Sequence, residues 1–329
     1  MTFLAYRVEK LEQGLQANWQ EFSVDGLPAG EVLIEVHYSS LNYKDALSAS
    51  GNKGVTRAFP HTPGIDAAGI VLTSSNAKFK AGDEVVVFGY DLGMNTAGGF
   101  GQQIRVPASW VLSKPASLSF AESMSWGTAG FTAALSIQKL ERAGISPENG
   151  PVVVTGATGG VGSVAVSLLA KLGYEVIAVS GKAKQAEFLM ALGAQQVISR
   201  EEIMAAKGKA MTKPLYQAAV DTVGGDMVSA LIPQIKAEGA VTTCGMIAGI
   251  KIEASVFPFI LRGVSLLGVD SVEIPLHDKQ SILNKVATEW ALPLDAQTTE
   301  IGRSGLSEVL AKILAGQGVG RYRLNLNKE

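Results

Sequence analysis

Two patterns of hydrophobic and polar positions divide the chain near residue 121. Before that point, glycine and proline turns separate short strands: Glu31–Tyr38 alternates apolar with polar residues, and Glu84–Phe88 is an apolar run. Such alternation is typical of a strand with one buried face. From about Ala121, apolar strands alternate with stretches whose apolar residues recur every three or four positions. This pattern predicts a mainly β region followed by βαβ units with a parallel sheet.

The second region contains six strand candidates, enough for a complete doubly wound sheet. Helices are expected over 161–172, 183–192 and 226–235, and glycines follow the first two of them as caps. Helices over 278–290 and 306–315 and a strand over 322–326 come last. We therefore expect a first domain of residues 1–122 and 293–329, with a cofactor domain of residues 123–292 inserted between. The six strands are expected at 152–155, 175–179, 196–198, 218–220, 240–243 and 265–269.

A glycine-rich loop lies between the first of these strands and its helix. Gly156, Gly159, Gly160 and Gly162 follow Val152–Thr155 directly and precede an apolar helical run. Glycines permit a tight turn and let backbone N–H groups approach a pyrophosphate, which the helix N-terminus favours. The spacing differs from the common G-x-G-x-x-G, so the surrounding βαβ pattern carries the interpretation. A dinucleotide site is expected here, and a purely structural turn is the alternative.

The segment after the second strand indicates which dinucleotide binds. An NAD site places Asp or Glu there for the ribose 2′-hydroxyl, but this chain reads Ser180-Gly181-Lys182. Ser180 can donate to a phosphate, and Lys182 and Arg200 can neutralise its charge. The sequence therefore favours NADPH. The alternative is that the two cations belong to solvated loops.

Composition narrows the classes of function. Lys and Arg number 28 and Asp and Glu 30, a net charge of −2, so no general basic surface for nucleic acid or an anionic membrane is expected. A single cysteine, Cys244, and three scattered histidines cannot supply the clustered ligands of a zinc site, and no metal is expected. The lone cysteine, the absence of a signal-peptide pattern and the lack of a long apolar run favour a cytoplasmic protein.

Short motifs occur along nearly the whole chain: Ser39–Asp45, Pro63–Gly69, Gly127–Ala133, the glycine loop, Asp221–Gly224, Pro258–Arg262 and Gly268–Ser271. Together they resemble the zinc-independent medium-chain dehydrogenases/reductases, in the quinone oxidoreductase-like branch that contains bacterial acrylyl-CoA reductases. Zinc-dependent relatives carry a Cys near Asn42 and a Gly-His-Glu where this chain has Gly64-Ile65-Asp66. The resemblance therefore also implies an enzyme without a catalytic metal.

The resemblance implies an α/β fold with a GroES-like, mostly β catalytic domain and a doubly wound Rossmann cofactor domain. It implies that Tyr43 and Thr128 approach the nicotinamide. Relatives often have Arg at the position of Lys182. The lysine keeps the positive charge but cannot form the two parallel hydrogen bonds of an arginine. The other cofactor residues that it implies are Thr158, Gly159, Gly160 and Val161 at the pyrophosphate, Ser180, Gly181, Lys182 and Arg200 at the adenosine phosphate, and Met246, Ile247, Asp270 and Ser271 over the nicotinamide.

Without a metal, reduction of an activated C=C bond is the easier hydride chemistry, because hydrogen bonds can stabilise the developing enolate oxygen. The resemblance implies hydride transfer from NADPH to the β-carbon of acrylyl-CoA and protonation at the α-carbon, giving propionyl-CoA. Tyr43 is the first candidate donor, and Asn42 and Asp45 are candidates for orienting it or the substrate. The alternatives are that Tyr43 packs against the cofactor, Asn42 supports a turn and Asp45 caps a helix.

Several further expectations concern partners. Lys53, Arg57 and Arg105 are candidates for binding CoA phosphates, whereas Arg262 is expected to anchor the sixth strand and Cys244 to be a small buried hydrophobe. An apolar sixth strand would be hazardous at an open sheet edge, so a homodimer is expected. Broad-specificity reduction of quinones, alkenals or enones is the alternative activity. A noncatalytic NADPH-binding protein is a remote one.

Overall fold

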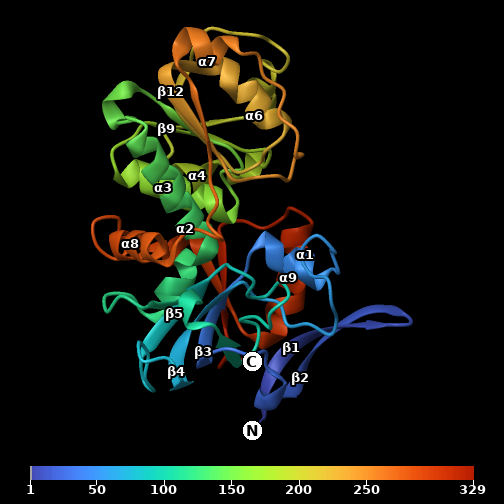
Figure 1. The fold of residues 1–329 in the computed structure, drawn as a ribbon. Helices are drawn as coiled ribbons and strands as arrows, with labels where there is room; N and C mark the ends of the chain where they lie inside the picture. Colours follow the sequence, from blue (N-terminus) through green and yellow to red (C-terminus); the bar gives the residue numbers. More distant parts are fainter. Residues whose placement is uncertain (1) are drawn as a thin grey trace. The chain divides into compact units, whose positions relative to one another are not determined.

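The computed structural model describes residues 2–329, which fold into two compact units (Figure 1). Unit 1 is built from the chain up to Thr128 and from Val272 to Glu329. Unit 2 is the intervening stretch, Ala129–Ser271. The polypeptide passes from unit 1 to unit 2 within helix α2 (Phe120–Arg142), whose backbone leaves the helical conformation at Gly127.

Unit 1 is built around a mainly antiparallel sheet with the strand order β14-β15-β3-β4-β5-β7, and β6 also pairs with β3. Alternate residues of β3, among them Val32, Ile34 and Val36, are buried in its core, as the period-two pattern predicts. Only β14 and β15 pair in parallel within this sheet. The elements of unit 1 are β1 (Thr2–Leu11), β2 (Gly14–Ser23), β3 (Val32–Ser40), α1 (Tyr43–Ala49), β4 (Asp66–Ser74), β5 (Glu84–Phe88), β6 (Gln103–Val106), β7 (Val111–Ser113), α8 (Leu276–Val286), β14 (Thr298–Ile301), α9 (Leu306–Leu314) and β15 (Arg321–Asn325).

Unit 2 contains a six-stranded parallel sheet in the order β10-β9-β8-β11-β12-β13. The order reverses between β8 and β11, which is the doubly wound arrangement with its ligand crevice at the carboxyl ends of these strands. The expected fold class is therefore confirmed. The elements of unit 2 are β8 (Val152–Val154), α3 (Gly160–Lys171), β9 (Val176–Val179), α4 (Ala186–Ala191), β10 (Gln196–Ile198), α5 (Arg200–Met204), β11 (Tyr216–Asp221), α6 (Asp226–Leu231), β12 (Ile235–Thr243), α7 (Phe257–Arg262) and β13 (Ser265–Gly268).

Unit 2 is shorter at both ends than the expected cofactor segment 123–292. Helix α8 belongs to unit 1 because its Lys279, which is fully buried, donates to the carbonyls of Phe88 at 2.8 Å and Val272 at 2.7 Å. The helix expected over 226–235 ends at Leu231 and continues as a 3-10 turn that contains Pro233. Within residues 2–329, no helix combines the length and the apolar character needed to cross a bilayer.

Candidate functional site

The backbone path of the glycine loop of unit 2 requires glycine at two positions. Gly156 adopts a φ of 58°, and a Cβ on Gly162 would lie 2.3 Å from the Gly156 carbonyl oxygen. Helix α3 starts directly after Gly159, its N-cap residue. Its first N–H groups have no partner within the helix and form a positive end suited to a pyrophosphate. The loop therefore fits a dinucleotide at the place where the sequence predicts one.

A buried carboxylate holds this loop against the neighbouring strand ends. Asp221, the last residue of β11, accepts hydrogen bonds from Thr155 Oγ1 at 2.7 Å, Gly224 N at 2.9 Å and Thr243 Oγ1 at 2.9 Å. Burial raises the pKa of Asp221, and the hydrogen bonds to its carboxyl group partly offset this rise. The sequence analysis assigned no role to Asp221. The feature that could have revealed it is an acidic residue at the carboxyl end of an apolar strand.

The candidate adenosine-phosphate residues come together at the ends of β9 and β10. The Ser180 N–H donates to the Ile198 carbonyl at 3.1 Å, and Ser180 Oγ accepts from Lys182 N at 2.9 Å. The Arg200 side chain passes over Gly181, where a Cβ would lie 2.8 Å from Arg200 Nε. A serine hydroxyl and a guanidinium at this position, with no carboxylate in the Ser180–Lys182 turn, fit a 2′-phosphate.

The other cofactor candidates of unit 2 follow the ends of two adjacent strands. Met246 and Ile247 come after β12 and are 69% and 64% exposed, respectively. Ser271, after β13, is buried, and its Oγ lies 2.7 Å from Thr132 Oγ1, which donates to it. Asp270 precedes it directly. All four thus lie beyond carboxyl ends of the parallel sheet, the edge where such folds bind ligands.

Unit 1 contains a buried polar cluster centred on Asp66, here called the Asp66 cluster and made of Ser40, Asn42, Asp66, Thr128 and Arg321. The Asp66 carboxylate is fully buried and accepts from Thr128 N at 2.8 Å, Thr128 Oγ1 at 2.5 Å and Asn42 Nδ2 at 2.9 Å. Ser40 Oγ also donates to it. Asn42, a candidate for orienting Tyr43 or the substrate, and Thr128, a candidate nicotinamide contact, therefore both donate to the same carboxyl group.

Arg321, at the start of β15, supplies the positive charge of this cluster. It is 1% exposed; its Nε donates to the Ser125 carbonyl at 3.0 Å and its Nη1 to Asn42 Oδ1 at 3.4 Å. Burial lowers the pKa of Arg321 to about 10, and the charges of Asp66 and Asp45 act in the opposite direction. A buried cation of this kind needs a buried counter-ion, which Asp66 provides.

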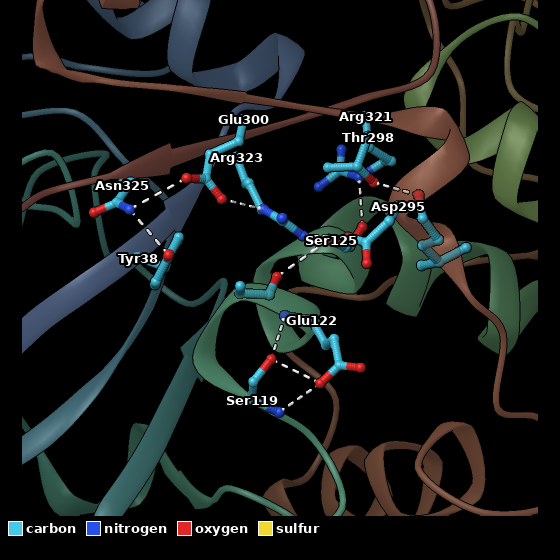
Figure 2. Close-up of polar contacts among 12 residues, drawn as sticks. Tyr38, Ser119, Glu122, Ser125, Asp295, Thr298, Glu300, Arg321, Arg323 and Asn325 are labelled. Carbon is cyan, nitrogen blue, oxygen red and sulfur yellow. Dashed lines mark hydrogen bonds and ion pairs between the residues drawn. The ribbon is translucent and has the colours of Figure 1, made fainter. Parts of the chain in front are cut away.

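Ser125 is held by two arginines of the same strand (Figure 2). Arg323 Nη1 donates to Ser125 Oγ and to Asp295 Oδ1, both at 2.7 Å, and Arg323 Nε donates to Glu300 Oε2 at 3.0 Å. Arg321 and Arg323 therefore fix the start of α2 from the last strand of the chain. The sequence analysis missed both, because arginines at alternate strand positions are also typical of a solvated face.

Gly127 allows the chain to reach the cluster. Its φ of 48° turns the backbone, and a Cβ there would lie 2.4 Å from Ser40 Oγ and 2.7 Å from Arg321 Nη2. Only glycine adopts this conformation without strain in so small a space. The turn brings both the N–H and the hydroxyl of Thr128 to Asp66.

Asn42, Tyr43 and Asp45 lie at the start of α1. Asn42 is the N-cap residue, and the fully buried Asp45 accepts from Asn42 N at 2.7 Å and from Ile65 N at 2.8 Å. Burial, followed by the charge of Asp66, raises the pKa of Asp45 to about 7. Asp45 therefore holds the turn that presents Tyr43, which is 36% exposed.

Four further basic residues were candidates for anchoring a strand or for binding CoA phosphates. Arg262 donates to the carbonyls of Thr212, Pro233 and Ile235, so it anchors the backbone that leads into β12, whereas the sequence analysis expected it to anchor the sixth strand. Arg105 donates to the Leu27 carbonyl at 3.3 Å, whereas Lys53 and Arg57 are exposed on the loop after α1.

Cys244 is half-buried rather than buried, and its Sγ donates to the Asp221 carbonyl at 3.4 Å. Burial, with the Asp221 charge second, raises the pKa of Cys244 to about 12. A thiol with so high a pKa forms little thiolate at neutral pH, which fits the expected structural role.

The residues present do not form a metal site. Within residues 2–329, no group of three or more His, Cys, Asp or Glu side chains is arranged to hold a metal ion. His61 contacts the Gly93 carbonyl through Nε2 at 2.9 Å, and burial lowers the pKa of its imidazole. In the Asp66 cluster, the Asp66 carboxyl oxygens already accept hydrogen bonds from the Asn42 amide and the Thr128 hydroxyl.

The chain matches two domain families. Residues 28–116 match the alcohol dehydrogenase GroES-like domain, and residues 160–287 match the zinc-binding dehydrogenase domain. The acrylyl-CoA reductase AcuI of Ruegeria pomeroyi is 41% identical over 99% of both chains. The second of these domains is named for zinc, but among residues 2–329 of this chain no group of three or more His, Cys, Asp or Glu side chains could hold a metal ion.

Two solved structures share the whole architecture. The Escherichia coli K-12 protein YhdH, solved with NADPH bound, has a TM-score of 0.94 and 40% identity over 98% of this chain and 100% of that one. The Bacillus subtilis protein YhfP, solved with NAD bound, has a TM-score of 0.96 and 41% identity over 99% of this chain and all of that one. YhfP carries a provisional name as a quinone oxidoreductase.

Proposed function

The chain belongs to the zinc-independent, quinone oxidoreductase-like branch of the medium-chain dehydrogenase/reductase family, and on this premise we propose that it reduces acrylyl-CoA to propionyl-CoA with NADPH. The observation that carries the choice of substrate is the 41% identity to an acrylyl-CoA reductase along 99% of both chains. The enzyme is an oxidoreductase, and its hydride goes to the β-carbon of the thioester while a proton reaches the α-carbon.

NADPH is the cofactor, and unit 2 offers residues for its phosphate groups. We assign the pyrophosphate to the turn that contains Thr158, Gly159, Gly160 and Val161, where the N–H groups at the start of α3 carry partial positive charge. Ser180 and Arg200 bind the 2′-phosphate, with Gly181 and Lys182 completing the turn. When bound, NADPH supplies the hydride.

The nicotinamide and the substrate are assigned to the remaining candidates. Met246, Ile247, Asp270 and Ser271 cover the nicotinamide, and Thr128 and Tyr43 contact it. The Tyr43 hydroxyl has no hydrogen-bond partner among residues 2–329, so its O–H can donate to the thioester oxygen as negative charge develops there. Asn42 and Asp45 hold the turn that carries Tyr43 and act as positioning residues.

We assign the CoA phosphates to α1 and the loop that follows it. Lys44, Lys53 and Arg57 lie there, and Asp45, which is buried, is the only acid between residues 43 and 65. Within the described chain, none of the three cations forms an ion pair with a carboxylate. Such a segment attracts phosphate groups, which CoA carries and a simple quinone lacks.

Steady-state kinetics of NADPH oxidation by chelator-treated enzyme test the proposal, with acrylyl-CoA and a naphthoquinone compared side by side. We expect acrylyl-CoA to be preferred about a hundredfold in kcat/KM, which corresponds to about 2.7 kcal/mol of transition-state stabilisation. Preference for the quinone would favour the second candidate, a broad-specificity quinone, alkenal or enone reductase. Oxidation of neither would favour the noncatalytic alternative.

A homodimer in which β13 pairs with its symmetry copy is part of the proposal. β13 is an edge strand, and exposed apolar side chains crowd the segment leading to it. Analytical ultracentrifugation tests this, and a monomer at micromolar concentration would contradict it. The exposed residues are Met246, Ile247, Ile250, Ile252, Val256, Phe257, Ile260, Leu261 and Leu266.

A further inference from the structure

Three adjacent strands of the parallel sheet in unit 2 end around one buried carboxyl group. Asp221, at the end of β11, is fully buried, and each of its oxygens accepts two hydrogen bonds. Oδ1 accepts from Thr155 Oγ1 at 2.7 Å and from Val223 N at 3.3 Å. Oδ2 accepts from Gly224 N and Thr243 Oγ1, both at 2.9 Å. The donors therefore come from the carboxyl ends of β8, β11 and β12.

The backbones that follow these strands are also packed against one another. A Cβ on Gly156 would meet Thr222 Oγ1, and a Cβ on Gly224 would meet the Gly245 carbonyl oxygen. Closely packed atoms leave no free space into which one loop could move alone. A displacement of the carboxyl group would therefore reach the glycine loop and the segment after β12 together.

Hydrogen bonds alone hold the Asp221 carboxyl group in place. Within residues 2–329, its partners are the four donors named above, and none of them is a Lys or Arg side chain. A buried polar group is costly when its hydrogen bonds are missing. The position of Asp221 and the positions of the loops that donate to it are therefore fixed by each other.

The residues that we assign to the adenosine 2′-phosphate lie outside this network. Ser180 N donates to the Ile198 carbonyl at 3.1 Å, and the Arg200 side chain passes over Gly181. These contacts join the segments after β9 and β10, and no hydrogen bond links them to the carboxyl group of Asp221. The cofactor candidates of unit 2 therefore belong to two separate sets of contacts.

We propose that Asp221 is a positioning residue for the pyrophosphate and nicotinamide portions of the cofactor, and that its two threonine partners divide this task. Thr155 aligns the glycine loop, which we assign to the pyrophosphate. Thr243 aligns the segment after β12, which we assign to the nicotinamide. The adenosine 2′-phosphate is held independently of all three residues. The proposal rests on the NADPH assignment made above.

Three ligands of increasing length separate these contributions. Adenosine 2′-monophosphate carries the 2′-phosphate, 2′-phospho-ADP-ribose adds the pyrophosphate and the second ribose, and NADP⁺ adds the nicotinamide. Calorimetry measures the affinities of the two larger ligands, and a ligand-observed NMR titration measures that of the smallest. Asp221→Asn keeps the shape but replaces an accepting oxygen with an amide nitrogen that can only donate. It should bind both larger ligands about tenfold more weakly and the monophosphate as wild type does.

Substitutions of the two threonines divide the effect. Thr155→Val should weaken binding of both larger ligands about tenfold, whereas Thr243→Val should weaken that of NADP⁺ alone. Thr155→Ser and Thr243→Ser keep the hydroxyls and should keep the affinities. Thr242→Val is the matched control, because Thr242 has a buried hydroxyl on the same strand that donates to the Ala219 carbonyl at 3.2 Å. It should bind all three ligands as wild type does.

The pattern of losses distinguishes positioning from a merely structural role. If Asp221→Asn weakens all three ligands equally, or none of them, the proposal is wrong. Should this variant fail to fold, the valine variants decide: an equal loss of 2′-phospho-ADP-ribose and NADP⁺ in Thr243→Val would contradict the division of tasks. A wild-type enzyme that binds none of the three ligands would contradict the NADPH assignment as well. No turnover is required, so the result is independent of acrylyl-CoA reduction.

Discussion

The two regions that we assign to ligand binding differ in the groups that form them. The glycine loop of unit 2 is a short contiguous segment that presents backbone, with Gly162 packed against the Gly156 carbonyl. The Asp66 cluster of unit 1 is made of side chains from distant segments, including the buried carboxyl group of Asp66 and the buried guanidinium of Arg321. Backbone geometry therefore governs the first region, and charge balance governs the second.

This difference has a physical consequence for each region. The loop should tolerate changes that leave its backbone path open, because the ligand contacts that we assign to it are N–H groups, which every residue except proline carries. The cluster depends on the identity of each partner, since an unbalanced charge in a buried site is costly. Substitutions in the Asp66 cluster should therefore lower the stability of the fold, whereas substitutions that close the loop should lower the affinity for the cofactor.

Loss of the buried cation should have the largest effect. Arg321→Met leaves Asp66 without its counter-ion, and we expect a loss of about 3–5 kcal/mol in the free energy of unfolding. Lys207→Met is the control, because both side chains of the Lys207–Asp226 ion pair are exposed, at 46% and 51%. That control should lose about 1 kcal/mol or less, as exposed ion pairs do. Urea denaturation measures both, and equal losses would contradict the charge-balance account.

Closing the glycine loop should have the next largest effect. A Cβ on Gly162 would lie 2.3 Å from the Gly156 oxygen and 2.7 Å from Ala157 Cα, so Gly162→Val must displace the turn. We expect NADPH to bind at least about a hundredfold more weakly, equivalent to about 2.7 kcal/mol. Gly268→Ala, where a Cβ meets no atom within 4 Å, is the control. An unchanged dissociation constant for Gly162→Val would exclude the loop as the pyrophosphate site.

Removal of the Arg200 guanidinium in unit 2 should weaken the binding of NADPH and leave the binding of NADH unchanged. Arg200→Ala removes the guanidinium beside Gly181. Loss of a charge-assisted hydrogen bond should weaken NADPH binding about tenfold. NADH lacks the 2′-phosphate, so its affinity should stay the same. Fluorescence titration with both cofactors makes the comparison, and a parallel loss for NADH would assign Arg200 a structural role.

A pH dependence of stability is also expected in unit 1. The pKa of Asp45 is raised from 3.8 to about 7, so the folded state holds this proton more tightly than the unfolded chain does. Its contribution is complete below the unfolded pKa and is lost as the pH rises through about 7. Relative to Asp45→Asn, wild type should lose stability from about pH 4 to about pH 8. Thermal unfolding across this range would contradict the assignment if the difference stayed constant.

The elements that the sequence predicts correctly are those with local signals. The strands of unit 2 are continuous apolar runs, and the loop at Gly156 follows one of them directly, so its place could be read from neighbouring residues. Ser180 and Arg200 each follow a strand of the parallel sheet, and the sheet order brings them together. In the structure, residues 272–292 group with unit 1, where the buried Lys279 of α8 donates to the Phe88 carbonyl, and local periodicity does not reveal this contact.

The Asp66 cluster was beyond sequence reasoning for a physical reason. Asn42 and Thr128 were recognised only through family resemblance, while Asp66 was part of a quoted motif without a role. Arg321 lies 279 positions from Asn42, and nothing in its own strand indicates burial. Networks of buried side chains depend on tertiary contacts between distant segments, whereas a backbone loop carries its own pattern.

Deuterium transfer tests the central claim most directly. Acrylyl-CoA would be incubated with NADPH deuterated at C4 of the nicotinamide, and the product analysed by NMR and mass spectrometry. We predict propionyl-CoA with one deuterium at the β-carbon and none at the α-carbon, because the hydride adds to the carbon remote from the thioester. Deuterium at the α-carbon, or the absence of propionyl-CoA, would contradict the proposed reaction.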